Sequence, residues 1–289
     1  MVKPRVLILR APGTNCDRET AFAFETAGAR ADTVHLNRLL ESPSVAQEYQ
    51  ILAIPGGFSY GDDISAGRIF GNQMRHHLYD ALHEFKTADK LILGICNGFQ
   101  ILLKSGVLLP DQAHEPLATL AQNASGKFED RWVHLRVTNP KSVFLQGIES
   151  LYLPVAHAEG KFVARDAATL ARLEAAGQLV LRYAEESEAR GQGSEVRGQE
   201  SEVRGQESER SPNPQPLAPS PQPCIPYPAN PNGAQVDVAG LADETGRVFG
   251  LMPHPERYID PTQHPRWTRA RHERGDGLAL FENAVRFFK

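Results

Sequence analysis

The stretch KLILGICNGFQILLK, residues 90–104, decides the fold of this chain. Its first part, Lys90–Ile95, is a short apolar run of the kind found in strands that are buried on both faces. A helical pattern follows from Asn97 to about Lys104, so that Cys96 alone separates the predicted strand from the predicted helix. A strand that passes this sharply into a helix indicates the strand–helix–strand units of an α/β protein.

The rest of the first half repeats this alternation of strands and helices. In chain order, the predicted segments are the strands Arg5–Arg10, Ala31–Leu36 and Gln50–Pro55, a helix from Asn15 or Asp17 to about Ala27 that ends at Gly28, and a helix over Met74–Phe85. Aliphatic and β-branched strands between amphipathic helices predict a mostly parallel sheet with helices on both faces.

The second half has more hairpin character. Its predicted elements are the strands Trp132–Thr138, Leu151–Val155, Leu179–Tyr183, Gln235–Ala242 and Val248–Met252, and a closing helix over about Gly277–Phe288. We expect these strands to join the first half in one mixed sheet, so that residues 1–289 form a single domain.

One segment, at about residues 187–222, is predicted to lie outside that sheet as a disordered insert. It begins with the seven-residue repeat SEARGQG, SEVRGQE, SEVRGQE, and nine prolines stand between Pro212 and Pro231. Each repeat offers at most one apolar side chain and a glycine, too little for the apolar seam of a coiled coil. Low hydrophobicity, high charge and many prolines favour disorder.

The overall composition narrows the class of protein. A net charge of −4 gives no reason to expect a nucleic acid or an anionic membrane as partner, and no apolar stretch approaches the length of a membrane span or a signal peptide. Three cysteines are too few for a disulfide framework, so we expect a cytoplasmic protein in which a thiol can work. No H-x-x-x-H, C-x-x-C, Walker or G-x-G-x-x-G motif is present, so we expect no metal and no nucleotide on this chain.

Cys96 is the strongest candidate for a chemical role. It is the centre of GICNG, residues 94–98, which has the G-x-nucleophile-x-G form of a nucleophile elbow. The sharp turn strains the backbone of the nucleophile and presses Gly94 against Gly98, where a side chain would not fit. The helix N-terminus favours a thiolate, and the N–H of Asn97 points where an oxyanion would form. The alternative is a buried core cysteine, which the pentapeptide alone does not exclude.

The other parts of such a site are present elsewhere in the chain. PHPE, residues 253–256, follows the predicted strand Val248–Met252, and the spacing lets the Glu256 carboxylate orient the His254 imidazole as a base. The Gly56-Gly57 turn closes another strand at the same edge of the sheet, where Gly57 could offer a second N–H to an oxyanion. Together these features favour Cys96 as the nucleophile of an acyl transfer.

Three other cysteine or histidine candidates are weaker. Cys16 lacks flanking glycines and an elbow, and packing at a helix start is its expected role. Cys224 lies in the proline-rich segment and is expected to be inert. His157 and Glu159 in AHAEGKF form a second i, i+2 pair, which we interpret as structural or as part of an interface.

GICNGFQ followed by PHPE resembles the class I, triad-type glutamine amidotransferases, whose domain is a flavodoxin-like α/β fold. Further motifs resemble one of their families, the glutaminase subunit of phosphoribosylformylglycinamidine synthase. They are APGTNCD (11–17), GGFSYGDD (56–63), GKFEDRWV (126–133), AHAEGKF (156–162), NPNG (230–233), GLMPHPER (250–257), PRWTR (265–269) and GDGL (275–278).

The resemblance implies a reaction and partners. It implies that Cys96 attacks the glutamine amide to form a glutamyl thioester, with His254 and Glu256 completing the triad. It places Gln100, Gly57 and Phe58 at the bound glutamine and the N–H groups of Gly57 and Asn97 in the oxyanion hole. The ammonia would pass to a separate synthase subunit, which holds ATP and Mg²⁺ and makes the amidine in purine synthesis, and a small third subunit would join the complex.

Two rival hypotheses stay open at this stage. A cysteine hydrolase of esters or peptides could use a similar elbow, although the position of Gln100 and the His254–Glu256 spacing argue against it. A catalytically silent subunit that only stabilises a synthase would not need an intact set of Cys96, His254 and Glu256.

Overall fold

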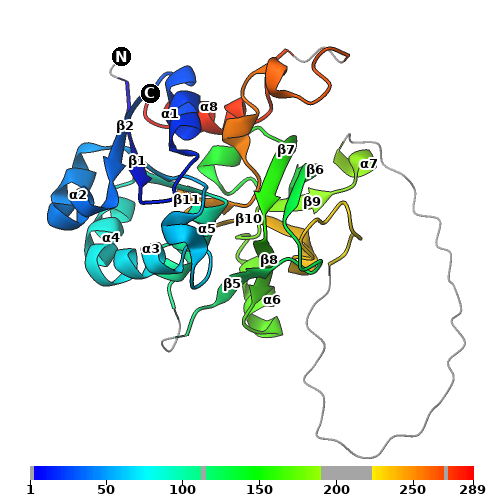
Figure 1. Ribbon diagram of the computed structural model, residues 1–289, viewed down its shortest axis with the longest axis horizontal. Helices are drawn as coiled ribbons and strands as arrows, with labels where there is room; N and C mark the ends of the chain where they lie inside the picture. Colours follow the sequence, from blue (N-terminus) through cyan, green and yellow to red (C-terminus); the bar gives the residue numbers. More distant parts are fainter. Residues whose placement is uncertain (1–2, 112–114, 190–222, 270–272) are drawn as a thin grey trace, which may run out of the picture.

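The structure is a computed structural model that describes residues 3–111, 115–189, 223–269 and 273–289 (Figure 1). Most of the predicted insert, residues 190–222, lies outside these ranges. Residues 187–189 are described and belong to the short helix α7 (Glu186–Ala189), which contacts strand β6. The described chain therefore keeps its contact with the sheet up to α7, close to the approximate start expected for the insert.

A nine-stranded sheet forms the centre of the described part of the chain. Its order is β2 (Arg30–His35), β1 (Arg5–Arg10), β3 (Ile51–Ile54), β4 (Leu91–Ile95), β11 (Val248–Leu251), β10 (Val238–Ala242), β9 (Leu181–Ala184), β6 (Glu129–Val137) and β7 (Ser150–His157). The first five strands pair in parallel and the remaining pairs are antiparallel, so only β10 and β6 run against the common direction. The predicted mixed, mostly parallel sheet is confirmed, and it includes strands from both halves of the chain.

Helices cover both faces of the parallel part, as predicted (Figure 1). They are α1 (Asp17–Thr26), α2 (Leu36–Glu41), α3 (Arg68–Gln73), α4 (Tyr79–Thr87), α5 (Asn97–Ser105) and α8 (Leu278–Arg286), and α6 (Ala167–Ala175) lies near the second sheet described below. Helices α1 and α8 pack together, while α3 packs on α5. The helix predicted over 74–85 begins as a π-helical turn, Met74–Leu78. None of these helices is long and apolar enough to cross a bilayer.

Two features outside the parallel part of the sheet differ from the prediction. A small antiparallel sheet of β5 (Ala118–Gln122) and β8 (Glu159–Ala164) was not predicted. The strand predicted over 235–242 starts only at Val238, because Gln235–Asp237 forms a 3₁₀ turn with positive φ at Val236 and Asp237. The Asp237 carboxylate stabilises that turn by accepting from the N–H groups of Cys224 and Ile225. Both features depend on distant partners, which local patterns do not contain.

The connection between β4 and α5 is as tight as its glycines predict. A Cβ built on Gly94 would lie 2.6 Å from the carbonyl oxygen of Gly98, and one built on Gly98 would lie 1.8 Å from that of Ile54 at the end of β3. These are backbone atoms in the middle of the sheet and cannot move aside cheaply. The elbow therefore fits against the edge of the sheet only with glycine at both positions.

We expect Gly98→Ala to lower the free energy of unfolding by about 3 kcal/mol or more, since the clash outweighs the gain of roughly 1 kcal/mol in helix propensity. Denaturant unfolding of the variant and the native protein measures this change in the free energy of unfolding. Gly126→Ala is the matched control: its φ is +65° but nothing lies within 4 Å of an added Cβ, so backbone strain alone should cost about 1 kcal/mol. Equal losses in the two variants would show that close packing at the elbow is not what Gly98 provides.

Candidate active site

Cys96 occupies the elbow in a strained conformation. Its φ of 50° and ψ of −106° are rare for a residue with a side chain, and the predicted strain is thereby confirmed. The backbone is held on both sides: the N–H of Cys96 donates to the carbonyl of Leu251 at 2.8 Å, and its own carbonyl accepts from Phe99 and Gln100 in α5. The Cys96 side chain is buried, with Sγ 3.8 Å from the carbonyl oxygen of Ala156.

His254 reaches the same place through the neighbouring strand. Strand β11 pairs in parallel with β4, with Leu251 opposite Ile95, so the residues after both strands emerge at one edge of the sheet. The N–H of His254 donates to the carbonyl of Pro154 at 2.8 Å, which fixes the turn. Its ring Nδ1 lies 2.6 Å from Oε1 of Glu256, and both side chains are buried. The predicted contact between Glu256 and the imidazole is confirmed.

The charge state of His254 follows from its neighbours. Burial lowers the pKa of His254, but the negative charge of Glu256 and the two nearby thiols, Cys96 and Cys16, outweigh burial and raise that pKa well above its ordinary value. An imidazolium is therefore stable beside Cys96. This is the state in which the ring has taken up a proton from the thiol.

The two N–H groups predicted for an oxyanion hole lie on adjoining segments. Asn97 is the first residue of α5, where a backbone N–H has no acceptor within the helix. Gly57 forms a β-bridge with Thr14. The hydrogen bonds around that bridge are donated by the N–H groups of Cys16 and Phe58, so the bridge does not use the N–H of Gly57. Gly57 has φ +138°, and an added Cβ would meet the backbone of Gly13–Asn15 at under 3 Å. Glycine is required there.

The side chain of Asn97 has a second role that sequence reasoning missed. Its Oδ1 accepts from the N–H and the hydroxyl of Ser59, the latter at 2.6 Å, and its Nδ2 donates to Asp62 and to Gln100. Burial raises the pKa of the Asp62 carboxyl. These bonds join the GGFSYGDD loop to the helix that follows Cys96, so Asn97 fixes the loop that carries Gly57.

Two of the residues predicted to contact glutamine differ in exposure: Gln100 is buried and Phe58 is exposed. Gln100 is buried on α5, with its Oε1 accepting from Asn97 and its Nε2 donating to the carbonyl of Glu159. Phe58 is 47% exposed and stacks on the exposed ring of Phe128, with 6.5 Å between the ring centroids. Gln100 thus links α5 to the segment of Glu159. Phe58 follows Gly57 in the same loop and lies at the protein surface.

The alternative pair of His157 and Glu159 is not formed. Nδ1 of His157 lies 3.1 Å from Oδ1 of Asn123, and the Glu159 carboxylate accepts from the N–H of Ala66 instead. The amide of Asn123 donates to two carbonyls, so its Oδ1 must accept and Nδ1 of His157 must carry the proton. Burial and the charge of His254 lower the pKa of His157 to about 3, so its ring is neutral.

Of the other two cysteines, Cys16 is buried and Cys224 is exposed. Cys16 precedes α1, as expected for a helix-start residue, but its Sγ lies within 4.8 Å of a ring nitrogen of His254. It also accepts from Nη2 of Arg257 at 3.1 Å, and burial raises the pKa of the Cys16 thiol. Its proximity to His254 was not predicted. Cys224 is exposed, and its N–H donates to Asp237.

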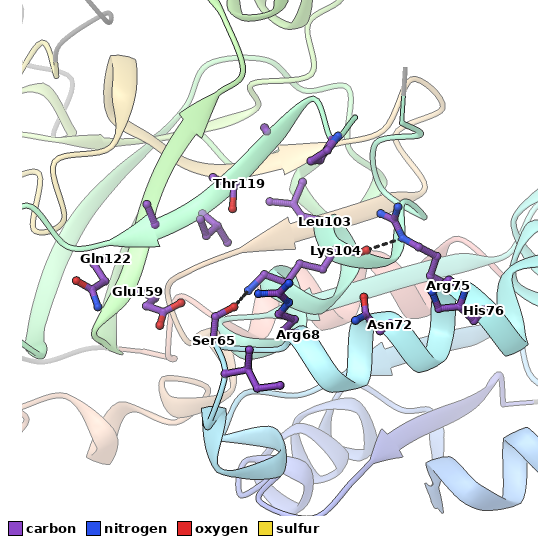
Figure 2. A pocket seen from close by; sticks show the side chains of 15 residues that line it. Ser65, Arg68, Asn72, Arg75, His76, Leu103, Lys104, Thr119, Gln122 and Glu159 are labelled. Atoms are coloured by element: carbon purple, nitrogen blue, oxygen red, sulfur yellow. Dashed lines mark hydrogen bonds between the residues drawn. The ribbon is translucent and has the colours of Figure 1, made fainter. Parts of the chain in front are cut away.

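A cavity of about 720 Å³ adjoins this region without containing Cys96 or His254 (Figure 2). Its wall includes Arg68, Arg75 and Lys104, and Nζ of Lys104 donates to Ser65 at 2.7 Å. Glu159 stands at its edge and also contacts Gln100 through its carbonyl. The cavity is therefore linked to α5 through Glu159 and Gln100, and the candidate thiol Cys96 is not among its lining residues.

Comparison with known proteins identifies the class that this fold and site define. The family model of the CobB/CobQ-like glutamine amidotransferase domain matches residues 3–203 and 216–288. A phosphoribosylformylglycinamidine synthase subunit PurQ from Dehalococcoides mccartyi is 44% identical, over 99% of this chain and 98% of the relative. One from Methanococcus maripaludis is 37% identical with the same coverage. The structure of PurLQS from Thermotoga maritima matches with a TM-score of 0.67 and 29% identity, covering all of both chains.

The chain belongs to the PurQ family of glutamine amidotransferases. The resemblance drawn from GICNGFQ, PHPE and the flanking motifs is thereby confirmed at the level of the family.

We expect Glu256→Gln to lower the pKa of His254, because it removes the charge that opposes burial, and to slow glutamine hydrolysis by about 10²- to 10⁴-fold. Nitrogen NMR of the ring measures the first effect and steady-state kinetics the second. In the native protein the raised pKa also means that protonated His254 stabilises the fold, a contribution lost as the pH rises through that pKa.

His157 serves as the control in the same spectra. It should stay neutral from pH 8 down to near pH 3 in both proteins. An unchanged pKa of His254 in the variant would contradict the role assigned to Glu256.

Proposed function

We propose that this chain is the glutaminase subunit of a phosphoribosylformylglycinamidine synthase. It hydrolyses glutamine to glutamate and ammonia through Cys96. The observation that carries the proposal is the strained Cys96 at the N-terminus of α5, beside a buried His254 that Glu256 orients at 2.6 Å. The names and full-length coverage of the PurQ relatives support the choice of synthase.

In the first half of the reaction, Cys96 gives its proton to His254 and its thiolate attacks the side-chain carbonyl carbon of glutamine. The carbonyl oxygen becomes an oxyanion that the N–H groups of Gly57 and Asn97 stabilise. When the tetrahedral intermediate collapses, His254 returns the proton to the departing nitrogen. Ammonia leaves, and the glutamyl group stays on Cys96 as a thioester.

In the second half, water replaces ammonia. His254 takes a proton from the water, whose oxygen attacks the thioester carbonyl, and the resulting glutamate leaves as Sγ recovers the proton. Glu256 stabilises the imidazolium in both halves and holds Nδ1, which leaves Nε2 for the proton transfers. Because His157 stays neutral, it adds no second positive charge next to this imidazolium.

Glutamine binds, in this proposal, along the loop that Asn97 fixes to α5. Gly57 and Phe58 belong to that loop, and Gln100 reaches the other side of the site through Glu159. The hydrogen bonds of Asn97 and Gln100 thus keep the oxyanion donors and the binding loop in one arrangement before the substrate arrives.

The ammonia goes to a partner. An ATP- and Mg²⁺-using synthase subunit accepts it to convert formylglycinamide ribonucleotide to the amidine, and a small third subunit joins the complex. No cofactor is assigned to this chain. The three cysteines are free thiols, which agrees with work in the reducing cytoplasm.

We expect Cys96→Ala to abolish glutamine-dependent amidine synthesis by the reconstituted complex and to leave synthesis from added ammonium salt intact. The variant removes the nucleophile but keeps the docking surface, so only the source of ammonia is lost. Product formation with each nitrogen donor measures the effect.

Cys224→Ala is the matched control, since it removes an exposed thiol that is not part of the elbow. It should keep both activities. Glutamine-dependent synthesis that persists in Cys96→Ala would overturn the proposal.

A further inference from the structure

The last residues of β7 contact both His254 and Cys96. The carbonyl of Pro154 accepts from the N–H of His254 at 2.8 Å. The carbonyl of Ala156 accepts a weak hydrogen bond from the Cys96 thiol, with 3.8 Å between Sγ and the oxygen. Strand β7 is the outermost strand of the nine-stranded sheet, and its pairing with β6 supports it on one side. The position of its end therefore depends on the groups that bind the turn beyond it.

Asn123 binds that turn, by which β7 passes into β8. It follows β5, and its side chain is buried. Its Nδ2 donates to the carbonyl of His157 at 2.8 Å, and its Oδ1 accepts from the N–H of Gly160 at 3.1 Å. Its own N–H donates to the carbonyl of Ala158 at 2.8 Å. One buried residue thus contacts the end of β7, the turn itself and the start of β8.

Asn232, in the NPNG motif, binds the next polar group of the same turn. Its Nδ2 donates to the carbonyl of Gly160 at 2.8 Å and to the hydroxyl of Tyr183 at 3.0 Å, and both residues are buried. The N–H and the carbonyl of Gly160 are therefore each bound by a buried asparagine. Since an unpaired buried polar group is costly, the turn cannot shift while these bonds are kept.

The ring of His157 packs against the same turn. A Cβ built on Gly160 would lie 2.4 Å from Cε1 of His157, so only a glycine fits beside the ring. Nδ1 of His157 lies 3.1 Å from Oδ1 of Asn123, and this contact holds the proton on Nδ1. Nε2 has no hydrogen-bond partner in the described part of the chain. The tautomer of His157 thus reports whether Asn123 keeps its contact with the turn.

We propose that Asn123 is a positioning residue for glutamine hydrolysis, with Asn232 in a supporting role. It holds the β7–β8 turn, and through that turn it holds the two carbonyls that fix the backbone of His254 and the direction of the Cys96 thiol. Its hydrogen bonds go to the turn and to the carbonyl of Lys127, so its effect on the reaction passes through β7. A displacement of about 1 Å between reacting groups can cost about 10²-fold in rate, which makes a remote amide decisive.

The kinetic test rests on the proposed function and uses the assembled complex. Asn123→Ala should lower kcat for glutamine by about 10²-fold, with kcat/KM falling equally, because the two carbonyls align the reacting groups and do not bind the substrate. Synthesis from added ammonium salt should not change. A native kcat, or a loss confined to KM, would overturn the proposal.

Asn283→Ala is the matched control. Asn283 is also buried, and its Nδ2 also donates to two carbonyls, those of Phe144 and Gln146 at 3.0 and 2.8 Å. These bonds join α8 to the turn Val143–Leu145. This variant should lose stability to a similar extent and keep the native kcat. An equal fall of kcat in both alanine variants would show that instability, and not the position of β7, slows the reaction.

Nitrogen NMR of His157 tests the contact without turnover. The native ring should carry its proton on Nδ1, and Asn123→Ala should gain the form protonated on Nε2. Asn123→Asp keeps the acceptor, so Nδ1 should stay protonated, but it loses the bond to the carbonyl of His157, so kcat should still fall. This variant carries the kinetic test if Asn123→Ala does not fold, and a native kcat in it would overturn the proposal. An unchanged tautomer in Asn123→Ala would overturn the role of Asn123 even if glutamine hydrolysis depends on Cys96 as proposed.

Discussion

The close contact between the backbones of β3, β4 and α5 at the elbow is the constraint on which the rest of the site depends. Gly94 and Gly98 press against each other and against Ile54, and no side chain fits between them. This packing turns the chain within a single residue and holds Cys96 at φ 50°. The strain is sustained because β4 is a central strand, paired in parallel on both sides and buried along its length. The packing of the sheet thus fixes the backbone of Cys96 and, with it, the position of the thiol.

The same sheet positions the other candidate catalytic groups. The parallel pairing of β11 with β4 brings His254 to Cys96 although 158 positions separate them in the sequence (254 − 96). The parallel pairing of β3 with β4 places the Gly56-Gly57 turn on the other side of the elbow. The proposed nucleophile Cys96 and Asn97 thus follow β4, the proposed base His254 follows β11, and Gly57 follows β3, three adjacent strands of the sheet. This is the arrangement expected for ligands at the carboxyl edge of an open α/β sheet.

The parts of this arrangement that the sequence could predict are those with a local cause. Glycines at 94 and 98 around a cysteine specify the elbow, and a histidine between prolines two residues from a carboxylate specifies the oriented base. The parts that it could not predict have partners far along the chain. Asn97 fixes Ser59 and Asp62, Asp237 stabilises a turn that replaces the start of a strand, and Cys16 approaches His254 across the sheet edge. In each case the partner of the polar group lies close to it only because the strands are aligned. The local sequence pattern therefore does not indicate the contact.

The central claim is that the elbow singles out Cys96, although Cys16 faces the same imidazole. Peptide mass spectrometry after treatment of the assembled complex with a glutamine-mimicking electrophile tests it directly. The account predicts one covalent adduct per chain, located on Cys96 and prevented by excess glutamine, with Cys16 and Cys224 unmodified. An adduct on Cys16 in place of Cys96, or equal labelling of the two thiols, would contradict it.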